Sequence, residues 1–238
     1  MKKLILTAAA LALTAGLASA QTVRLGTEGA YPPYNFINDA GEIDGFEREL
    51  GDELCKRAEL TCEWVTNDWD SIIPNLVSGN YDAIIAGMSV TEERDKVIDF
   101  TQEYVPPAPT LYVGRSADAD IKGVVAAQTA TIQAAYVAES GATLLEYPTP
   151  DETIAAVRNG EADVVLADKD FLMPIVNESN GELVVVDQIQ IGGGVGMGLR
   201  ESDTELKAKF DAAIQSMKDD GTLNPLIVKW FGDGVALW

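Results

Sequence analysis

The chain has 238 residues, of which 38 are acidic, 17 are basic and none is histidine, so its formal net charge is −21 at pH 7. A surface this acidic argues against binding to nucleic acid or to anionic membranes and favours a soluble monomer. Without histidine the chain cannot form a serine–histidine–acid triad, and no other nucleophile motif is present in the sequence.

The start of the chain has the pattern of an export signal. Lys2 and Lys3 form a basic start, residues 4–17 form an apolar run, and residues 18–20 (Ala-Ser-Ala) form a small-residue cleavage site. The apolar run is too short for a membrane span, so we expect cleavage after Ala20 and secretion to the periplasm. The remaining length allows one large domain or two domains of about 100 residues each.

Strand-like and helix-like segments alternate along the rest of the chain, and this alternation predicts an α/β fold. Pro74 is tolerable only near the first turn of the second predicted helix, and Gly160 and Gly221 end the last two. The predicted elements are, in chain order, strand Val23–Thr27, helices Phe46–Ala58 and Trp69–Ser78, strands Asp82–Ala86, Leu111–Gly114, Val124–Ala127 and Leu144–Tyr147, helix Pro150–Asn159, strands Val164–Ala167 and Leu183–Val186, a glycine-rich extended segment over Gly192–Leu199, and a long helix marked by Leu206, Phe210, Ile214 and Met217.

Two parts of the chain repeat the same local pattern. Asp82–Gly87 and Asp163–Asp168 each follow a helix and a glycine turn, and each ends an apolar strand with residues that could face a ligand. In open α/β sheets, ligands gather at the carboxyl ends of the strands. The repeat therefore predicts two similar lobes that face each other.

Polar residues follow the first of these two strands. Thr91 is predicted to cap a helix whose first turn is residues 92–95, and the free backbone N–H groups of such a turn attract an anion. Arg94 adds a planar fork that matches a carboxylate, Ser89 adds a donor, and Gly87 lets the backbone come close. The segment favours a small carboxylate ligand. The alternative is a surface arginine that pairs with one of its acidic neighbours, Glu92, Glu93 or Asp95.

Four further residues stand where a ligand could meet them, and each has a structural alternative. Asp168 ends the second strand and could hold an ammonium group or cap the next helix. Tyr31 lies in a proline-stiffened loop and Trp69 lies just before a helix, so their rings either sandwich a planar or cationic side chain or pack at the edge of the core. Glu28 is then either a counter-charge for that side chain or a solvated loop acid.

The two cysteines, Cys55 and Cys62, are expected to form a disulfide, because that is the default in an exported chain. A metal pair is the alternative, but the sequence has no histidine and no third cysteine to complete such a site. The glycine run over residues 192–198 does not match the G-x-G-x-x-G nucleotide fingerprint in any register. We therefore expect neither a metal nor a cofactor.

Several segments, taken in their order along the chain, resemble the extracellular solute-binding proteins of polar amino-acid ABC transporters, over about residues 22–233. Relatives of this kind bind lysine, arginine and ornithine, or histidine, or glutamine. The segments that carry the resemblance are Val23–Tyr34 (VRLGTEGAYPPY), Gly45–Leu50 (GFEREL), Asp70–Leu76 (DSIIPNL), Ser89–Arg94 (SVTEER), Gln128–Gln133 (QTATIQ), Gly196–Arg200 (GMGLR), Asp220–Asn224 (DGTLN) and Lys229–Gly232 (KWFG).

The resemblance implies a two-lobed periplasmic binding-protein fold of type II, in which two crossing strands form the hinge and the lobes close on an amino acid. It implies that residues 1–20 are the signal peptide, that residues 21–109 plus 198–238 form lobe 1, and that residues 110–197 form lobe 2. The cysteine pair is similar to that of the lysine/arginine/ornithine and histidine binders.

The resemblance also implies which residues contact the ligand. Those assigned to the α-carboxylate are Arg94 and the N–H groups of Ser89 and of the Thr131–Ile132 turn; those assigned to the α-ammonium are Asp168, the Ser89 hydroxyl and the Gly87 carbonyl; those assigned to the side chain are Tyr31 and Trp69 on its flanks, Glu28 at its far end and Gln128 at a variable pocket position.

Three residues depart from the pattern of the family. Ala86 replaces a serine of the basic-residue binders, and Ala130 replaces a glycine in the second lobe, so both bear on which ligand binds. Arg48 replaces an apolar residue and bears on the first helix rather than on the site.

The expected function is to bind a polar, basic L-amino acid (arginine, lysine, ornithine or histidine) and to deliver it to an inner-membrane ABC permease, without enzymatic activity. Glutamine is the alternative ligand, because an acid at position 28 can also accept a hydrogen bond from an amide. The alternative of another class is an enzyme that resembles the periplasmic cyclohexadienyl dehydratases. It would need a general acid in the cleft, for which Glu28 is the candidate.

Overall fold

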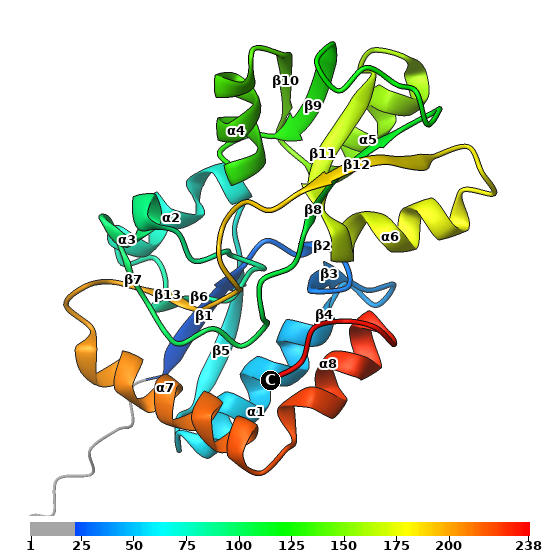
Figure 1. Ribbon diagram of the computed structural model, residues 1–238. Coiled ribbons are helices and arrows are strands. Elements are labelled where there is room, and N and C mark those ends of the chain that lie inside the picture. The colour runs from blue at the N-terminus through cyan, green and yellow to red at the C-terminus, as the bar shows by residue number, and fades with distance from the viewer. Residues whose placement is uncertain (1–21) are drawn as a thin grey trace, which may run out of the picture.

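The computed structural model describes residues 22–238, so the predicted signal peptide and its cleavage site lie outside the described residues. Two five-stranded sheets form the centres of two lobes, which Figure 1 shows one above the other. The strand order in lobe 1 is β5 (Cys62–Thr66), β1 (Val23–Thr27), β6 (Ala83–Ile84), β13 (Gly198–Leu199) and β7 (Asp99–Phe100); in lobe 2 it is β10 (Thr143–Tyr147), β9 (Val124–Gln128), β11 (Val164–Asp168), β8 (Thr110–Gly114) and β12 (Val184–Ile189).

Helices cover both faces of each sheet (Figure 1). Successive strand residues point to opposite faces, which is why Ala83 and Ile84 of β6 belong to different apolar clusters. In lobe 1 the helices are α1 (Phe46–Arg57), α7 (Thr204–Asp219) and α8 (Leu223–Phe231) on one face and α2 (Ile72–Val77) on the other; in lobe 2 they are α5 (Pro150–Asn159) and α6 (Lys169–Glu178) on one face and α4 (Ile132–Ser140) on the other.

Short elements surround the space between the lobes. They are a three-stranded sheet of β2 (Ala30–Tyr31), β3 (Asn35–Ile37) and β4 (Ile43–Asp44), a 3₁₀ turn over Trp69–Ser71, and the one-turn helix α3 (Glu92–Asp95). The Thr91 side chain accepts a hydrogen bond from the Arg94 N–H over 3.2 Å, so the predicted cap of α3 is confirmed.

Most predicted elements are confirmed, some with their bounds. The strand at Val23–Thr27 and the helix at Pro150–Asn159 begin and end as predicted, and Gly160 ends that helix in the left-handed region with φ of 79°. The helix predicted over Trp69–Ser78 starts as the 3₁₀ turn and continues as α2, whose third residue is Pro74. Local sequence patterns and end signals suffice for these elements because each one is bounded by signals within a few residues of its ends.

One predicted strand is shorter than expected. Only Ala83–Ile84 of the segment predicted at 82–86 forms β6, and Gly87, with φ of 61°, turns the chain three residues after the strand. The glycine-rich segment at 192–199 was predicted to be extended, and Gly198–Leu199 at its end forms β13. The sequence pattern does not predict α4, α6 or α8; α6 contains Pro174, a residue that normally interrupts a helix.

The chain crosses between the lobes twice, before β8 and after β12, and the two crossing segments pair with each other. The Tyr104 N–H donates to the Val195 carbonyl over 2.7 Å, and the Val195 N–H donates to the Val105 carbonyl over 2.9 Å. Val195 also forms a bridge with Ser89, so the hinge is tied to a segment that faces the space between the lobes. The residue boundaries of the lobes stay a prediction.

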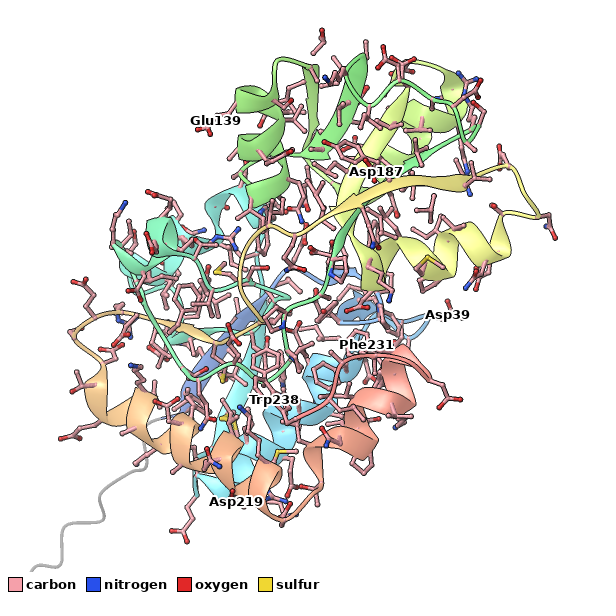
Figure 2. The ribbon with its side chains drawn as sticks, viewed as in Figure 1. Asp39, Glu139, Asp187, Asp219, Phe231 and Trp238 are labelled. Carbon is pink, nitrogen blue, oxygen red and sulfur yellow. A yellow bond between two sulfur atoms is a disulfide. The ribbon has the colours of Figure 1, made fainter. Side chains whose placement is uncertain are left out.

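A disulfide joins Cys55 in α1 to Cys62 at the start of β5, as predicted. Acidic side chains lie on the outside of both lobes, as Figure 2 shows for Asp39, Glu139, Asp187 and Asp219, all of which are exposed. Over residues 22–238, no helix combines the length and the apolar character that a bilayer crossing requires.

Candidate functional site

A pocket lies between the two lobes, and the ten residues predicted to bind a ligand all line it. Two further residues, Ala86 and Gln133, complete its lining. The lining residues are Glu28, Tyr31, Trp69, Ala86, Gly87, Ser89 and Arg94 from lobe 1 and Gln128, Thr131, Ile132, Gln133 and Asp168 from lobe 2.

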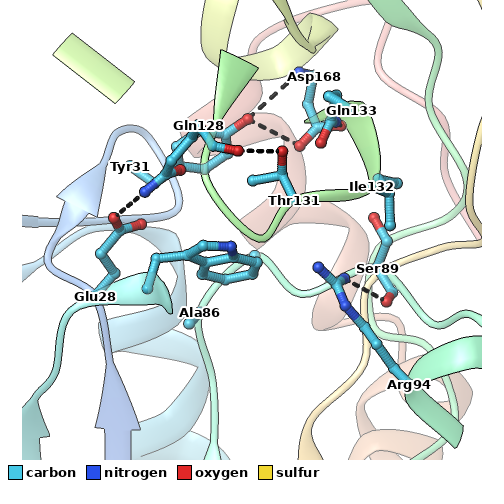
Figure 3. A pocket seen from close by; sticks show the side chains of 12 residues that line it. Glu28, Tyr31, Ala86, Ser89, Arg94, Gln128, Thr131, Ile132, Gln133 and Asp168 are labelled. Atoms are coloured by element: carbon cyan, nitrogen blue, oxygen red, sulfur yellow. Dashed lines mark hydrogen bonds between the residues drawn. The ribbon is translucent and has the colours of Figure 1, made fainter. Parts of the chain in front are cut away.

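The ends of strands place most of these residues. Glu28 follows β1, Gly87 lies in the turn after β6, Gln128 ends β9 and Asp168 ends β11. Carboxyl ends of parallel strands meet at one edge of a sheet, so the pocket lies where the two edges face each other. Figure 3 shows Arg94, Ser89 and Ile132 on one side of the pocket and Glu28 on the opposite side.

Arg94 carries a positive charge that no described acid neutralises. Its Nη1 donates to the Ser89 carbonyl over 2.9 Å, and its guanidinium lies 5.3 Å from the centre of the Trp69 ring. None of the ion pairs among residues 22–238 includes Arg94, and its neighbour Glu93 pairs with Lys96 instead. The alternative of a surface arginine paired with adjacent acids is therefore wrong.

Burial lowers the pKa of Arg94 to about 10, and the charge of Asp168 partly opposes this shift. The guanidinium therefore stays protonated at neutral pH. Near it, the backbone N–H groups of Ser89 and Ile132 donate to no acceptor among the described residues. Ile132 is the first residue of α4, where the helix leaves N–H groups free. Together these donors can hold one carboxylate.

Asp168 stands at the N-cap position of α6 but does not cap that helix. Its carboxylate accepts hydrogen bonds from the Tyr31 hydroxyl and from Nε2 of Gln133, each over 2.8 Å. Burial raises the pKa of Asp168 to about 6, and the hydrogen bond from Tyr31 opposes that shift. The helix-cap alternative is wrong, because a polar network that reaches lobe 1 holds the carboxylate instead.

Glu28 and Gln128 meet across the pocket. Gln128 Nε2 donates to Oε1 of Glu28 over 2.6 Å and to the Pro148 carbonyl over 3.1 Å. Burial raises the pKa of Glu28 to about 7, and the hydrogen bond from Gln128 opposes this rise. The alternative of a solvated loop acid is therefore wrong, and Glu28 can be charged or neutral near physiological pH.

The aromatic residues also connect the lobes rather than only bordering the core. The Tyr31 ring stacks on Phe171 of α6, with ring centres 4.5 Å apart. Trp69 Nε1 donates to the Ala130 carbonyl over 3.3 Å. Ala130 has φ of 60°, a conformation in which glycine is relaxed, which explains why the family pattern has glycine there.

Two of the three residues that differ from the family pattern, Ala86 and Arg48, lie in different parts of lobe 1. Ala86 lines the pocket and supplies no hydroxyl. Arg48 lies on α1, where its Nε donates to Oδ2 of Asp52 over 2.8 Å and its guanidinium lies 5.5 Å from the centre of the Trp64 ring. Arg48 thus belongs to the surface of the first helix and does not line the pocket.

Gln133 also lines the pocket and was not predicted from the sequence. Gln133 is buried, and its amide orients Asp168. A polar residue in the first turn of a helix that follows a predicted pocket turn was the available signal. Among the described residues, no group of histidine, cysteine and acidic side chains is arranged to hold a metal ion.

The chain is similar in sequence to known proteins. The chain matches the family model of the bacterial extracellular solute-binding proteins, family 3, over residues 23–233. It is 31% identical over 262 residues to the lysine/arginine/ornithine-binding periplasmic protein of Escherichia coli, with 97% of each chain covered.

Two solved structures extend the likeness to the fold. One is a periplasmic His/Glu/Gln/Arg/opine family-binding protein from Silicibacter pomeroyi in complex with lysine, 75% identical, with a TM-score of 0.90 over 91% of this chain and 100% of that one. The other is an ancestral arginine-binding protein bound to glutamine, 30% identical, with a TM-score of 0.82 over 89% of this chain and 98% of that one.

Proposed function

We propose that this chain, which belongs to the bacterial extracellular solute-binding proteins of family 3, binds a basic L-amino acid in the periplasm and delivers it to an ABC permease. One observation carries the proposal: a partly buried cation, Arg94, and a partly buried acid, Asp168, face one pocket from different lobes without pairing to each other. A zwitterion supplies the opposite charge for each.

In this proposal the ligand carboxylate binds Arg94 and the free N–H groups of Ser89 and Ile132. The ligand ammonium binds Asp168 and the Gly87 carbonyl. Each charge-assisted hydrogen bond contributes about 1.5–3 kcal/mol. Because the two ends of the ligand are held by different lobes, a bound amino acid stabilises the closed arrangement over an open one.

The side chain of the ligand then lies between Tyr31 and Trp69 and points to Glu28. Glu28 is the only acid at that end of the described pocket lining, and no second arginine lies there. An ionised Glu28 favours a cationic side chain and repels an acidic one. The 75%-identical relative in complex with lysine supports lysine as the first candidate. Arginine, ornithine and histidine belong to the same class.

Glutamine is the second candidate ligand. Glu28 can accept a hydrogen bond from an amide, and Gln128 already donates one to it. The ancestral arginine-binding protein bound to glutamine supports this alternative. Protonation of Glu28 would favour glutamine over lysine, because a neutral acid no longer attracts a cation.

We propose a binding role rather than an enzymatic one. The lysine/arginine/ornithine-binding relative and the 75%-identical solved structure are both named as binding proteins. Every acid in the described pocket lining can serve a zwitterion with a cationic side chain, so none is left for a separate chemical step. Incubation of the protein with prephenate or arogenate should give no turnover; measurable turnover would favour the dehydratase alternative.

A thermal-shift screen of the twenty amino acids, ornithine and citrulline tests the proposal. A ligand that binds only the folded chain raises the melting temperature by mass action, so the ranking gives the preference. We expect lysine, arginine and ornithine to give the largest shifts, with glutamine behind them. A screen without any shift, or one led by glutamate, would overturn the proposal. Light scattering of the same samples should give the mass of a monomer.

A further inference from the structure

A fully buried acid, Glu47, lies in lobe 1 outside the lining of the pocket. It is the second residue of α1, is 0% exposed, and forms no ion pair with a described cation. Its carboxylate accepts hydrogen bonds from the Gly87 N–H and from Nδ2 of Asn35, each over 2.7 Å, and from the Tyr104 hydroxyl. Burial without a cationic partner costs stability, so packing alone does not account for an acid here.

The first of these hydrogen bonds orients a peptide of the pocket. The Gly87 N–H points to Glu47, and the peptide group is planar and trans, so the Ala86 carbonyl points to the opposite side. Neither this carbonyl nor that of Gly87 accepts a hydrogen bond from a described residue. Both residues line the pocket. Glu47 therefore holds a segment whose carbonyl oxygens are free for a ligand cation.

The second hydrogen bond reaches the other end of the pocket. Asn35 is also 0% exposed, and its Oδ1 accepts from the Gly29 N–H over 2.7 Å while its Nδ2 donates to Glu47. Gly29 turns the chain directly after Glu28 with φ of 74°. The third donor, Tyr104, belongs to the crossing segment that pairs with Val195. One carboxylate thus connects both ends of the lobe 1 side of the pocket with the hinge.

We propose that Glu47 is a positioning residue for ligand binding: it fixes the backbone of Gly87, whose carbonyl meets the ligand ammonium, and, through Asn35, the turn that carries Glu28. This inference rests on the proposed function. It concerns a residue that touches no ligand and acts through the groups that do.

The variant Glu47→Gln tests the network because an amide replaces only one carboxylate oxygen. Its oxygen can still accept from Gly87 and Tyr104, but its NH₂ group then faces the NH₂ group of Asn35. Turning the Asn35 amide would leave the Gly29 N–H against a second donor. We expect the dissociation constant of lysine to rise about tenfold or more, and that of glutamine to rise as well.

The double variant Glu47→Gln/Asn35→Asp restores every hydrogen bond. The new amide donates to the new carboxylate, which still accepts from Gly29, and the buried negative charge is kept. We expect lysine affinity to return to within about threefold of the unmodified protein. Thr153→Val is the matched control, since Thr153 is a buried polar residue of α5 that does not line the pocket. It should change the melting temperature and leave affinity unchanged.

Calorimetry of folded protein separates the outcomes. If the unmodified protein binds no amino acid, the proposed function fails. If it binds lysine and Glu47→Gln lowers only the melting temperature, or the double variant does not recover, the role of Glu47 is overturned. Should Glu47→Gln not fold, Asn35→Ala decides. This variant frees the turn after Glu28 and removes one donor from Glu47, while Gly87 and Tyr104 still donate to the other carboxylate oxygen. It should therefore lower the affinity for lysine more than the affinity for glutamine, and an equal or absent loss would refute the positioning role.

Discussion

Tyr34 and Asp170 lie in different lobes, and the Tyr34 hydroxyl donates to Oδ2 of Asp170 over 3.2 Å. Neither residue lines the pocket, so this hydrogen bond favours the closed arrangement without a contact to the ligand. Tyr34→Phe should therefore shift the equilibrium between closed and open arrangements toward the open one. It should lower the affinity for every amino acid by the same factor, about two- to tenfold. Isothermal titration calorimetry with lysine, arginine and glutamine measures that factor.

The control for this variant is Tyr147→Phe. The Tyr147 hydroxyl donates to Glu161 over 3.0 Å within lobe 2, so its loss should leave the affinities unchanged. Factors that differ from one ligand to the next after Tyr34→Phe would show that Tyr34 acts on the pocket and not on closure.

Arg94→Ala should abolish amino-acid binding, with a loss of about a hundredfold or more, because the ligand carboxylate would lose its cation in a buried site. The fold should persist, since no described acid pairs with Arg94 and the Thr91 cap needs only the backbone of residue 94. Calorimetry and circular dichroism check the two expectations. Lys96→Ala removes an exposed cation nearby and should have no effect. Micromolar affinity retained by Arg94→Ala would remove this residue from the site.

Glu28→Gln should change selectivity rather than abolish binding. The variant loses a charge that attracts a cationic side chain but can still accept a hydrogen bond from an amide. We expect the affinity for lysine to fall about tenfold or more and the affinity for glutamine to change by less than about threefold. Competition between the two ligands in one titration gives the ratio directly. Equal losses for both would argue against a basic ligand.

The affinity for lysine should depend on pH through Glu28, whose pKa burial raises to about 7. Above this pH the carboxylate is charged and attracts the ligand ammonium. As the pH falls through 7 the carboxylate takes up a proton that the cationic ligand must displace, so lysine affinity falls. The affinity for glutamine should fall only when Asp168, with a pKa of about 6, is protonated. A lysine-to-glutamine ratio that stays constant between pH 8 and pH 6 would contradict this assignment.

Reduction of the Cys55–Cys62 disulfide should lower the melting temperature by a few degrees. The bridge closes a short loop between α1 and β5, which on the chain-entropy account contributes about 2–3 kcal/mol. Neither cysteine lines the pocket, so the affinity for lysine should not change. Differential scanning calorimetry with and without reductant checks the first point. An unshifted melt would show that the bridge does not stabilise the fold.

Properties that depend on neighbours in the chain were predictable from the sequence. Thr91 caps α3 and Gly160 ends α5 because caps and stops act over three or four residues. The α/β alternation and the disulfide follow from equally local signals. Arg94 and Asp168 could be recognised as candidates because each follows a strand, but their local alternatives, an ion pair and a helix cap, could not be excluded.

Only the tertiary structure decided between those alternatives, because the deciding partners are distant in the sequence. Tyr31 and Asp168 are 137 positions apart, and Glu28 and Gln128 are 100 apart. Glu47 and Gly87 are 40 positions apart. Periodicity reports which face of an element is buried, whereas a hydrogen bond between such distant groups depends on how whole sheets and lobes meet. Most residues of the pocket could therefore be predicted from the sequence, whereas Gln133 and the hydrogen-bond network that positions the pocket residues could not.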